Sequence, residues 1–474
     1  MNTSLSRSIG QNPWFIWLLV VGSSALTLRM VLGGQIELLF ILVMGGTALI
    51  FLSFHPVTGL VLLLLIDLQF FNFIQVDALP YFQVTSSLRI NSQDMLTILL
   101  LARSIFVLTQ KRERPLFLRP LLLLFGVTVL SFLFGIVSGT ASFEMAGRIF
   151  RFVIKYGIYF IIVATINSRQ SLETLIKVLY LFAIIGLVLQ FIEKARGAYL
   201  VLNYDWDPFL QGIPYYLLLG GSSVPYIWNR AQFYLYIASF FTLASLLLSQ
   251  RINRWHLVFV CMSGLGFVLM LIRSWYIFIS VGTMVMLLLS PSRRRLRLFT
   301  YGLISALLLF LGMTLIGELT TLTTFGQAGI ENFVFRLQTL QNFQMESSFL
   351  GRVDLWKIQL ANFYESPLFG LGPGSQALYA INTDTGLVNT LLLYGIVGLL
   401  AVFVLIIAIF RQAYRLWRQL RSLRERAYVL GMIAGMAGVT FGYGFSFDAF
   451  TLSPIIPVLV MGLLDRIKAF YTPT

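Results

Sequence analysis

Charge is scarce in this chain of 474 residues, of which 11% are charged and 58% are hydrophobic. A typical soluble domain has about 25% charged residues, so this composition excludes that class. Apolar runs of roughly 18 or more residues recur along the whole length, and each can cross a membrane as a helix. The mean hydropathy of +0.85 agrees. The sequence therefore predicts a polytopic helical membrane protein.

Cysteine and histidine are nearly absent. Cys261 is the one cysteine, so no disulfide can form within the chain. The two histidines, His55 and His256, lie at ends of apolar runs that we assign to the cytoplasmic side. No histidine is thus available on the outer side as a metal ligand or a base, and no P-loop or dinucleotide fingerprint occurs. We expect neither a metal nor a cofactor.

Acidic residues are fewer than basic ones, 19 against 34, which gives a net charge of +15. We do not interpret this as nucleic-acid binding, because the cations lie in short segments between apolar runs, as the positive-inside rule expects. The segment 411–427 is basic with Leu and Trp interleaved, and has a second interpretation as a helix lying on an anionic membrane surface. Four basic segments fall on one predicted side, which we take as cytoplasmic: 111–114, 251–254, 293–297 and 411–427.

We expect an all-α bundle of about 12–14 membrane-spanning helices, with a large, partly helical outer loop late in the chain. Residues 1–316 supply about eleven of these spans, with a mid-length outer loop at 194–230. Residues 317–386 form the large outer loop, far longer than an ordinary connection, and 387–474 supply the last spans. We detect neither the inverted repeats nor the broken helices typical of transporters. The expected span centres are Leu19, Leu42, Leu63, Ile98, Val127, Phe160, Phe182, Ile237, Leu265, Gly282, Leu307, Val404, Gly435 and Val458.

Cations on the outer side break the positive-inside pattern, and an arginine near the middle of the membrane usually has a partner or a function. Arg273 lies between two apolar runs that cover 256–290, at their predicted outer turn; the alternative is a turn residue with a snorkelling side chain. Arg148, Arg151 and Lys155 share one face of the predicted sixth span. They either bind an anionic ligand or pair with lipid phosphate.

The large outer loop contains two segments with helical spacing, 330–343 and 349–364. Arg336 and Arg352 fall on them, and each is either a ligand-binding group or a solvated charge. Pro367 cannot continue the second helix.

Glycines 370, 372 and 374 come next, and they allow either a tight turn or a close approach of the backbone to a ligand. Asp384 lies directly before the next apolar run, as the N-cap of that helix or as a functional carboxylate. Arg230 is a further outer cation, at the end of the aromatic-rich loop 194–230.

Part of this pattern resembles a known family. Arg352, Trp356, the run 367–374 (PLFGLGPG) and the run 391–398 (LLLYGIVG) are together similar to the signature segment of the bacterial O-antigen ligase and polymerase superfamily. Arg273, with the serine that follows it, resembles the Ser-Arg element of that family. The specific part covers about a fifth of the chain; elsewhere the likeness is only that of a polytopic chain with one large outer loop.

The resemblance implies an enzyme of the bacterial plasma membrane whose site faces the outside. It would transfer or polymerise a glycan, of O-antigen or exopolysaccharide type, from a polyprenyl-pyrophosphate carrier onto a glycan or lipid-linked acceptor. The implied chemistry is metal-independent inverting transfer. The expected partners are the lipid-linked donor, the acceptor and membrane lipids, without nucleic acid. The rival from another class is a non-enzymatic lipid-linked glycan flippase or secondary transporter.

Residue roles follow from the same resemblance. Arg273 and Arg352 match the two functional arginines of the family and are the expected catalytic groups at the pyrophosphate. Ligases usually carry a His-Asn pair where this chain has Asp384 and Thr385, which favours a polymerase or a divergent ligase and leaves Asp384 as the candidate base. The expected substrate-binding residues are Arg148, Arg151, Lys155, Arg230, Arg336, Gly372 and Gly374.

Overall fold

The computed structural model describes residues 55–67, 81–83, 89–196, 216–219, 222–225, 231–249, 253–270, 273–290, 347–373, 375, 385–445, 448–451 and 454–472. Its helices are α4 (Pro56–Asp67), α6 (Ser92–Lys111), α7 (Leu118–Val137), α8 (Phe143–Thr165), α9 (Arg169–Arg196), α10 (Ala231–Leu248), α11 (Arg254–Met270), α12 (Arg273–Leu289), α15 (Ser347–Phe363), α17 (Gly386–Gln419), α18 (Leu423–Phe445) and α19 (Ile455–Tyr471).

Four of the described helices are long and apolar enough to cross a membrane: α7, the part of α9 up to Phe191, α17 and α18. The helical content and these apolar helices confirm the prediction of an all-α helical membrane protein. Every predicted span centre within the described residues lies in a helix. The remaining three centres, Leu19, Leu42 and Leu307, lie outside the described residues.

Two short hairpins were not predicted. β1 (Tyr81–Gln83) pairs antiparallel with β2 (Arg89–Asn91), with Phe82 opposite Ile90. β3 (Tyr216–Leu219) pairs in the same way with β4 (Ser222–Pro225). Both hairpins lie in connections between the predicted spans. No alternating apolar pattern long enough to predict a strand occurs there.

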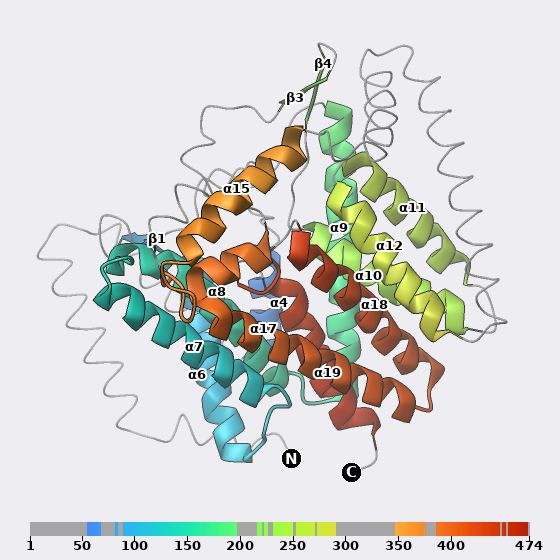
Figure 1. The fold of residues 1–474 in the computed structure, drawn as a ribbon. Helices are drawn as coiled ribbons and strands as arrows, with labels where there is room; N and C mark the ends of the chain where they lie inside the picture. Colours follow the sequence, from blue (N-terminus) through green and yellow to red (C-terminus); the bar gives the residue numbers. More distant parts are fainter. Residues whose placement is uncertain are drawn as a thin grey trace, which may run out of the picture.

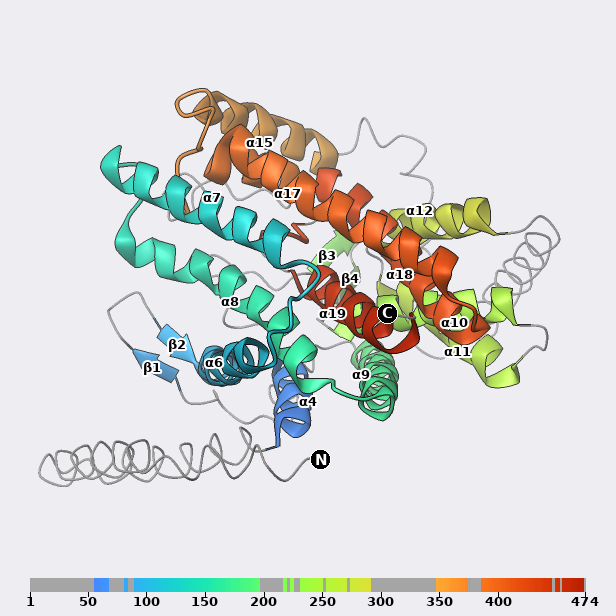
Figure 2. The same ribbon diagram turned by 90° about the horizontal axis from the view of Figure 1, so that it is seen from below.

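The bundle is arranged around α18 and α19, whose residues are mostly buried. Figures 1 and 2 show α6, α7 and α8 on one side of this pair and α9 to α12 on the other. α17 runs beside α7 and packs on α18. Because successive helices run in opposite directions, the connections gather at two ends of the bundle.

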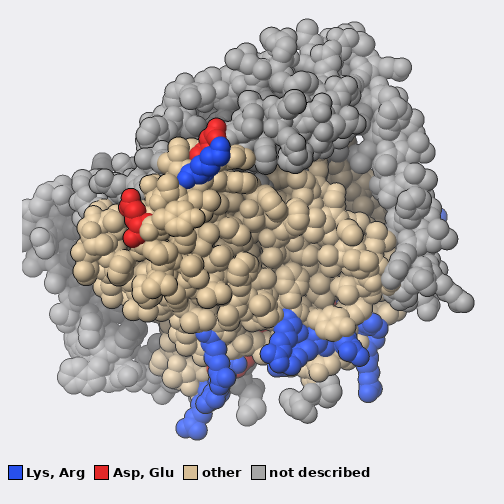
Figure 3. Space-filling view, viewed as in Figure 1, with Lys and Arg blue, Asp and Glu red and all other residues tan. Residues whose placement is uncertain are grey.

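One end, which we call the basic end, contains the α6–α7 loop, the start of α9, the start of α18 and the end of α19. The backbone N–H of Leu116 donates to Asp465 Oδ2 at 2.8 Å, and Arg169 Nη2 donates to the Phe470 carbonyl at 2.8 Å. An ion pair also joins the start of α18 to α9. The basic segments 111–114 and 411–427 therefore meet at one end, as the sequence predicts. Figure 3 shows most of the visible blue side chains along the lower edge of the molecule, which is the basic end.

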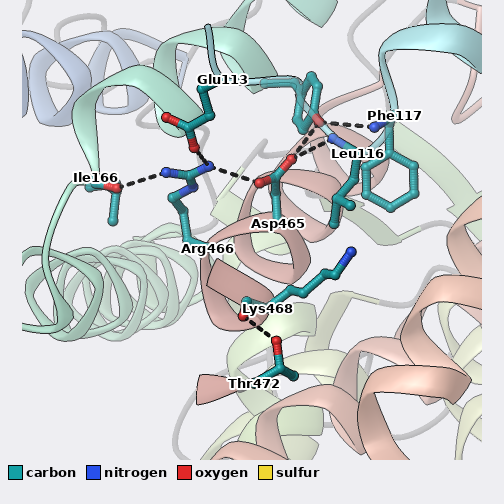
Figure 4. Close-up of polar contacts among 9 residues, drawn as sticks. Glu113, Leu116, Phe117, Ile166, Asp465, Arg466, Lys468 and Thr472 are labelled. Atoms are coloured by element: carbon teal, nitrogen blue, oxygen red, sulfur yellow. Dashed lines mark hydrogen bonds and ion pairs between the residues drawn. The ribbon is translucent and has the colours of Figure 1, made fainter. Parts of the chain in front are cut away.

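A buried ion-pair cluster joins the elements of the basic end. The Arg466 side chain is 5% exposed, and its Nη2 lies 2.8 Å from Asp465 Oδ1 and pairs also with Glu113. Asp465 Oδ2 accepts a second hydrogen bond, from the Tyr159 hydroxyl at 2.7 Å. Figure 4 shows the guanidinium between the two carboxylates, with its other Nη facing the Ile166 carbonyl. The cluster connects the α6–α7 loop, α8 and α19.

The opposite end, which we call the site end, contains the α7–α8 turn, α15, the start of α17 and the end of α18. Thr140 Oγ1 donates to the Leu371 carbonyl at 2.7 Å, and Thr385 Oγ1 donates to the Phe445 carbonyl at 3.3 Å. These contacts bring the segment after α15 onto α7 and the start of α17 onto α18.

The basic segment 411–427 is not a loop. Residues 411–419 continue α17 as regular helix, only 420–422 connect it to α18, and α18 begins at Leu423. The interpretation of this segment as a separate helix lying on the membrane surface is therefore wrong, because the helix continues the direction of the span.

Candidate functional site

α17 is broken at Gly395, whose backbone angles of φ 65° and ψ −165° are not helical. A break inside a membrane helix frees amides and carbonyls that must find other partners, because lipid supplies none. The expectation that no helix is broken is therefore wrong. The run 391–398 is apolar throughout and contains only single glycines, so nothing in its hydropathy marks the break.

The run 367–372 closes this break with its own backbone. In a continuous helix the amides of residues 396 and 397 would bond to the carbonyls of residues 392 and 393. Here all four groups bond instead to the segment that follows α15, in an exchange like that between two strands. The bonds are Leu371 N to Leu392 O (2.8 Å), Gly372 N to Leu393 O (3.0 Å), Ile396 N to Pro367 O (2.9 Å) and Val397 N to Leu368 O (3.2 Å).

The glycines of the signature run explain why this exchange is possible. Gly370 and Gly395 both have positive φ, at 70° and 65°. A Cβ at Gly395 would lie 2.2 Å from the Leu368 carbonyl oxygen, and one at Gly370 would lie 2.5 Å from the Leu393 carbonyl carbon. Only glycine allows two backbones to approach so closely.

Gly372 makes the second contact of the same run. Its φ is 84°, and a Cβ there would lie 2.8 Å from the Ser131 carbonyl oxygen of α7. The close approach that the sequence left open is thus an approach to the backbone of α7 and α17. Contact of Gly372 with substrate stays a prediction, and Gly374 lies outside the described residues.

A chain of hydrogen bonds ties α15 to the start of α17 and the end of α18. Trp356 Nε1 donates to Thr385 Oγ1 at 2.8 Å, and Thr385 donates onward to the Phe445 carbonyl. Arg352 lies one helical turn before Trp356, and Asp384 directly precedes Thr385. The helix that carries Arg352 is therefore fixed beside the start of α17.

The N-cap residue of α17 is Thr385, and its side chain makes no capping bond. The alternative in which Asp384 is the N-cap is therefore wrong, because Asp384 lies one position further out. Asp384 itself lies outside the described residues, and its role as a base stays a prediction.

The start of α12 reaches the same end of the bundle. Arg273 is its first residue, after the turn predicted between two antiparallel apolar runs. Trp275 is buried, and its Nε1 donates to Gln232 Oε1 of α10 at 2.9 Å. Further along, Phe278 packs on Gly438 and Gly442 of α18. Since α12 and α18 are antiparallel, the start of α12 lies level with the end of α18.

The N-terminal part of α8 contributes the cationic stripe. The Tyr156 hydroxyl donates to the Phe450 carbonyl at 2.9 Å, which joins α8 to the connection between α18 and α19. Lys155 is half-buried beside Tyr156. Arg148 and Arg151 lie one to two turns closer to the site end on the same helix.

Asp448 is a residue that the sequence analysis missed. It lies between α18 and α19, is 4% exposed, and accepts hydrogen bonds from the Thr451 amide (2.8 Å), the Phe450 amide (3.3 Å) and the Thr451 hydroxyl. These bonds fix the turn whose Phe450 carbonyl receives Tyr156. The available signal was that Asp448 is the one charged residue between Arg426 and Asp465 in the sequence.

A pair of hydroxyls completes the packing at this end. The Tyr443 hydroxyl hydrogen-bonds the Thr390 hydroxyl, and the Tyr443 ring packs edge-on against Phe450 at 5.1 Å between centroids. A Cβ at Gly386 would lie 2.3 Å from the Tyr443 ring and 2.9 Å from the Asp448 Cα. The first turn of α17 is thus pressed against α18 and the Asp448 turn.

Of the predicted site residues, those on α8, α12 and α15 lie in helices whose ends meet at the site end: Arg148, Arg151, Lys155, Arg273 and Arg352. The predicted residues Arg230, Arg336, Gly374 and Asp384 lie outside the described residues. Within the described part of the chain, no group of three or more His, Cys, Asp or Glu side chains is placed to hold a metal ion.

Comparison with known proteins gives no family for the chain. No protein-family model matches it, and no curated protein matches it.

Proposed function

We propose that this chain is a membrane glycosyltransferase that transfers or polymerises a glycan from a polyprenyl-pyrophosphate carrier, with its active site at the site end. The observation that carries the proposal is the chain of hydrogen bonds from Trp356 through Thr385 to α18. It supports a site in which Arg352 and Asp384, far apart in the sequence, act on the same substrate. The start of α12, with Arg273, lies at the same end.

The chemistry that these groups would perform balances without a metal or a cofactor. The acceptor hydroxyl oxygen attacks the anomeric carbon, a new glycosidic bond forms, and the bond to the pyrophosphate oxygen breaks. The pyrophosphate leaves with the electron pair, and the hydroxyl proton passes to Asp384. Inversion at the anomeric carbon follows from attack opposite the leaving group.

Arg273 and Arg352 would stabilise the negative charge that grows on the leaving pyrophosphate. Fixed donors of this kind are often the largest catalytic contribution, and loss of one costs about 10²–10³ in turnover. The planar guanidinium makes paired contacts with phosphate that an ammonium cannot make.

Arg148, Arg151 and Lys155 on α8 would hold the carrier as it approaches. Unchanged apparent affinity for the lipid-linked donor in Arg151→Gln would return this stripe to a lipid-pairing role.

The connection between α18 and α19 would position the site rather than react. Asp448 uses both carboxylate oxygens within its own turn, which holds Phe450 against Tyr156. We therefore expect Asp448 to be a positioning residue. It would affect transfer through the geometry of the part of the site that contains Asp384.

The rival function, a lipid-linked glycan flippase or secondary transporter, gains one observation, since broken helices form the ion and substrate sites of many transporters. In those proteins the unwound backbone offers carbonyls to the ligand. Here the two carbonyls and two amides that a break at Gly395 sets free bond to the run 367–372. This closure disfavours the transporter reading and favours a structural break that supports the site end.

The test uses purified protein and a lipid-linked glycan donor, and compares wild type with Asp384→Asn. Asparagine keeps the shape of the side chain but accepts no proton at neutral pH. We expect glycan transfer to fall by about 10²–10⁴, the usual contribution of a general base, while slow hydrolysis of the donor persists. The matched control is Asp354→Asn on α15, an exposed carboxylate that pairs with Lys357 at 2.9 Å, and we expect this variant to remain fully active.

Transfer within about twofold of wild type in Asp384→Asn would remove this residue from the mechanism. Absence of donor turnover in wild type, with movement of the intact donor across a vesicle bilayer, would replace the enzyme by the flippase.

In cells that lack the protein, short chains on the carrier indicate a polymerase, and chains of normal length retained on the carrier indicate a ligase. Both proposals place the site on the outer face of a bacterial plasma membrane.

A further inference from the structure

One face of α17 is exposed along the whole length after the break. Its exposed apolar side chains are followed on the same face, at helical spacing, by arginines and a tyrosine. The apolar members are Ile396 (43% exposed), Leu400 (57%), Phe403 (39%), Val404 (44%) and Ile407 (62%), and the polar members are Arg411, Tyr414, Arg415 and Arg418. The apolar part suits lipid chains, so the change between Ile407 and Arg411 marks the surface of the hydrocarbon layer.

The arginines of this face are placed at the depth of lipid headgroups. From Arg411 to Arg418 the helix advances roughly 10 Å along its axis, which exceeds the headgroup layer of about 5–7 Å, so the long side chain of Arg418 reaches back toward that layer. Tyr414 lies among them, 45% exposed, with Arg418 stacked over its ring at 6.0 Å. Tyrosine is enriched at this depth, because its ring is apolar and its hydroxyl is polar.

Two other cations of the same segment contact protein groups instead. Arg424 pairs with Glu173 at 3.1 Å, and Arg426 stacks over the Trp417 ring at 5.4 Å. By contrast, no carboxylate of the described residues forms an ion pair with Arg411, Arg415 or Arg418. The stretch from Arg411 to Arg424 contains no acidic residue at all.

We propose that Arg411, Arg415 and Arg418 form a binding site for the phosphates of anionic phospholipids at the basic end. A topology signal requires only that cations lie near the end of a span, whereas a headgroup site requires them on the lipid-facing side, where these three lie. Neighbouring members are about 6 Å apart along the helix, close enough for two of them to contact one phosphate. The site is independent of the proposed glycosyl transfer and of which side of the membrane the basic end faces.

The test uses the full-length protein in nanodiscs of phosphatidylcholine with an increasing fraction of phosphatidylglycerol, and follows the thermal unfolding midpoint. We expect phosphatidylglycerol to raise the midpoint of wild type, with a gain that shrinks as salt increases. Each Arg→Gln change at 411, 415 or 418 should raise the half-saturating fraction by about fivefold, the equivalent of one cation near an anionic surface. Inorganic phosphate at the same concentration should give no gain, because a free anion is not concentrated at the membrane surface.

The matched control removes three exposed cations of the α6–α7 loop at the same end: Lys111→Gln, Arg112→Gln and Arg114→Gln. The control triple variant should keep the phosphatidylglycerol response, and so should the triple Arg→Lys variant of α17. An equal loss of the phosphatidylglycerol response in the control triple variant would mean that general surface charge causes the response. That result would overturn the proposed site. An unchanged response in Arg415→Gln, which is expected to fold, would also overturn it and leave an acidic protein partner or a topology signal as the role of these arginines.

Discussion

The basic end and the site end of the bundle use different chemistry to hold their elements together. At the basic end the described connections are short, and buried charges join them, with Arg466 between Glu113 and Asp465. At the site end backbone hydrogen bonds, neutral hydroxyls and closely packed glycines join α15, α17 and α18.

This difference indicates a division of labour. Buried ion pairs are costly to break once formed, because removal of one partner leaves an uncompensated charge. A basic end that is joined by buried ion pairs keeps its shape without a ligand. In the proposed function, the anionic pyrophosphate of the substrate balances the arginines predicted for the site end. The following changes test this division, from the largest expected effect to the smallest.

Asp465→Ala should be the most damaging change to stability. It leaves the Arg466 guanidinium, the Leu116 amide and the Tyr159 hydroxyl without their shared acceptor. Removal of one partner of a buried pair costs about 3–5 kcal/mol. Thermal unfolding of the purified protein in detergent should show a large fall in midpoint. A midpoint within error of wild type would mean that the cluster contributes nothing to the basic end.

Gly395→Ala tests the closure of the α17 break. The new Cβ would overlap the Leu368 carbonyl at positive φ, and we expect a loss of about 2–4 kcal/mol from strain and overlap together. Gly139 also has positive φ but has nothing within 4 Å, so its alanine variant should lose only the strain part. Gly126→Ala, in open space on α7 without positive φ, should be neutral or slightly stabilising. Equal midpoints for all three would contradict the close backbone approach.

The glycines also show how much of the fold could be predicted from the sequence. The membrane class, the helix at α15 and the separate helices α11 and α12 followed from apolar run length and helical spacing, which are local properties. The break at Gly395 could not be predicted, because the hydrogen bonds that close it come from another segment of the chain. An isolated glycine in an apolar run does not indicate such bonds. The pairing of Arg466 with Glu113 was missed for the same reason, since it joins residues 353 positions apart.

Trp356→Phe should have a small effect on stability and a larger one on activity. It removes the indole N–H that Thr385 accepts, a loss of about 0.5–1.5 kcal/mol for one hydrogen bond. If α15 positions Arg352 against the start of α17, turnover of the lipid-linked donor should fall further than the stability change explains. The matched control is Trp417→Phe at the basic end, whose Nε1 is buried and has no hydrogen-bond partner among the described residues. Equal activities in the two variants would show that the Trp356 contact is not needed.

Glu173→Gln should have the smallest effect. Its ion pair with Arg424 is exposed, with 38% and 52% of the two side chains accessible, and exposed pairs contribute roughly 0–1 kcal/mol. The midpoint should stay within a few degrees of wild type and should become less sensitive to salt. A fall as large as that of Asp465→Ala would mean that burial does not distinguish the two ion pairs.

The most direct test of the central proposal compares turnover and stability for arginines at the two ends. Arg273→Lys and Arg352→Lys at the site end, and Arg415→Lys at the basic end, each keep the charge and remove the planar fork. Donor turnover and the thermal midpoint would be measured on the same purified preparations. We predict that both site-end variants lose about 10²–10³ in turnover with unchanged midpoints, and that Arg415→Lys keeps both. Full turnover in Arg273→Lys and Arg352→Lys would contradict a pyrophosphate site at this end.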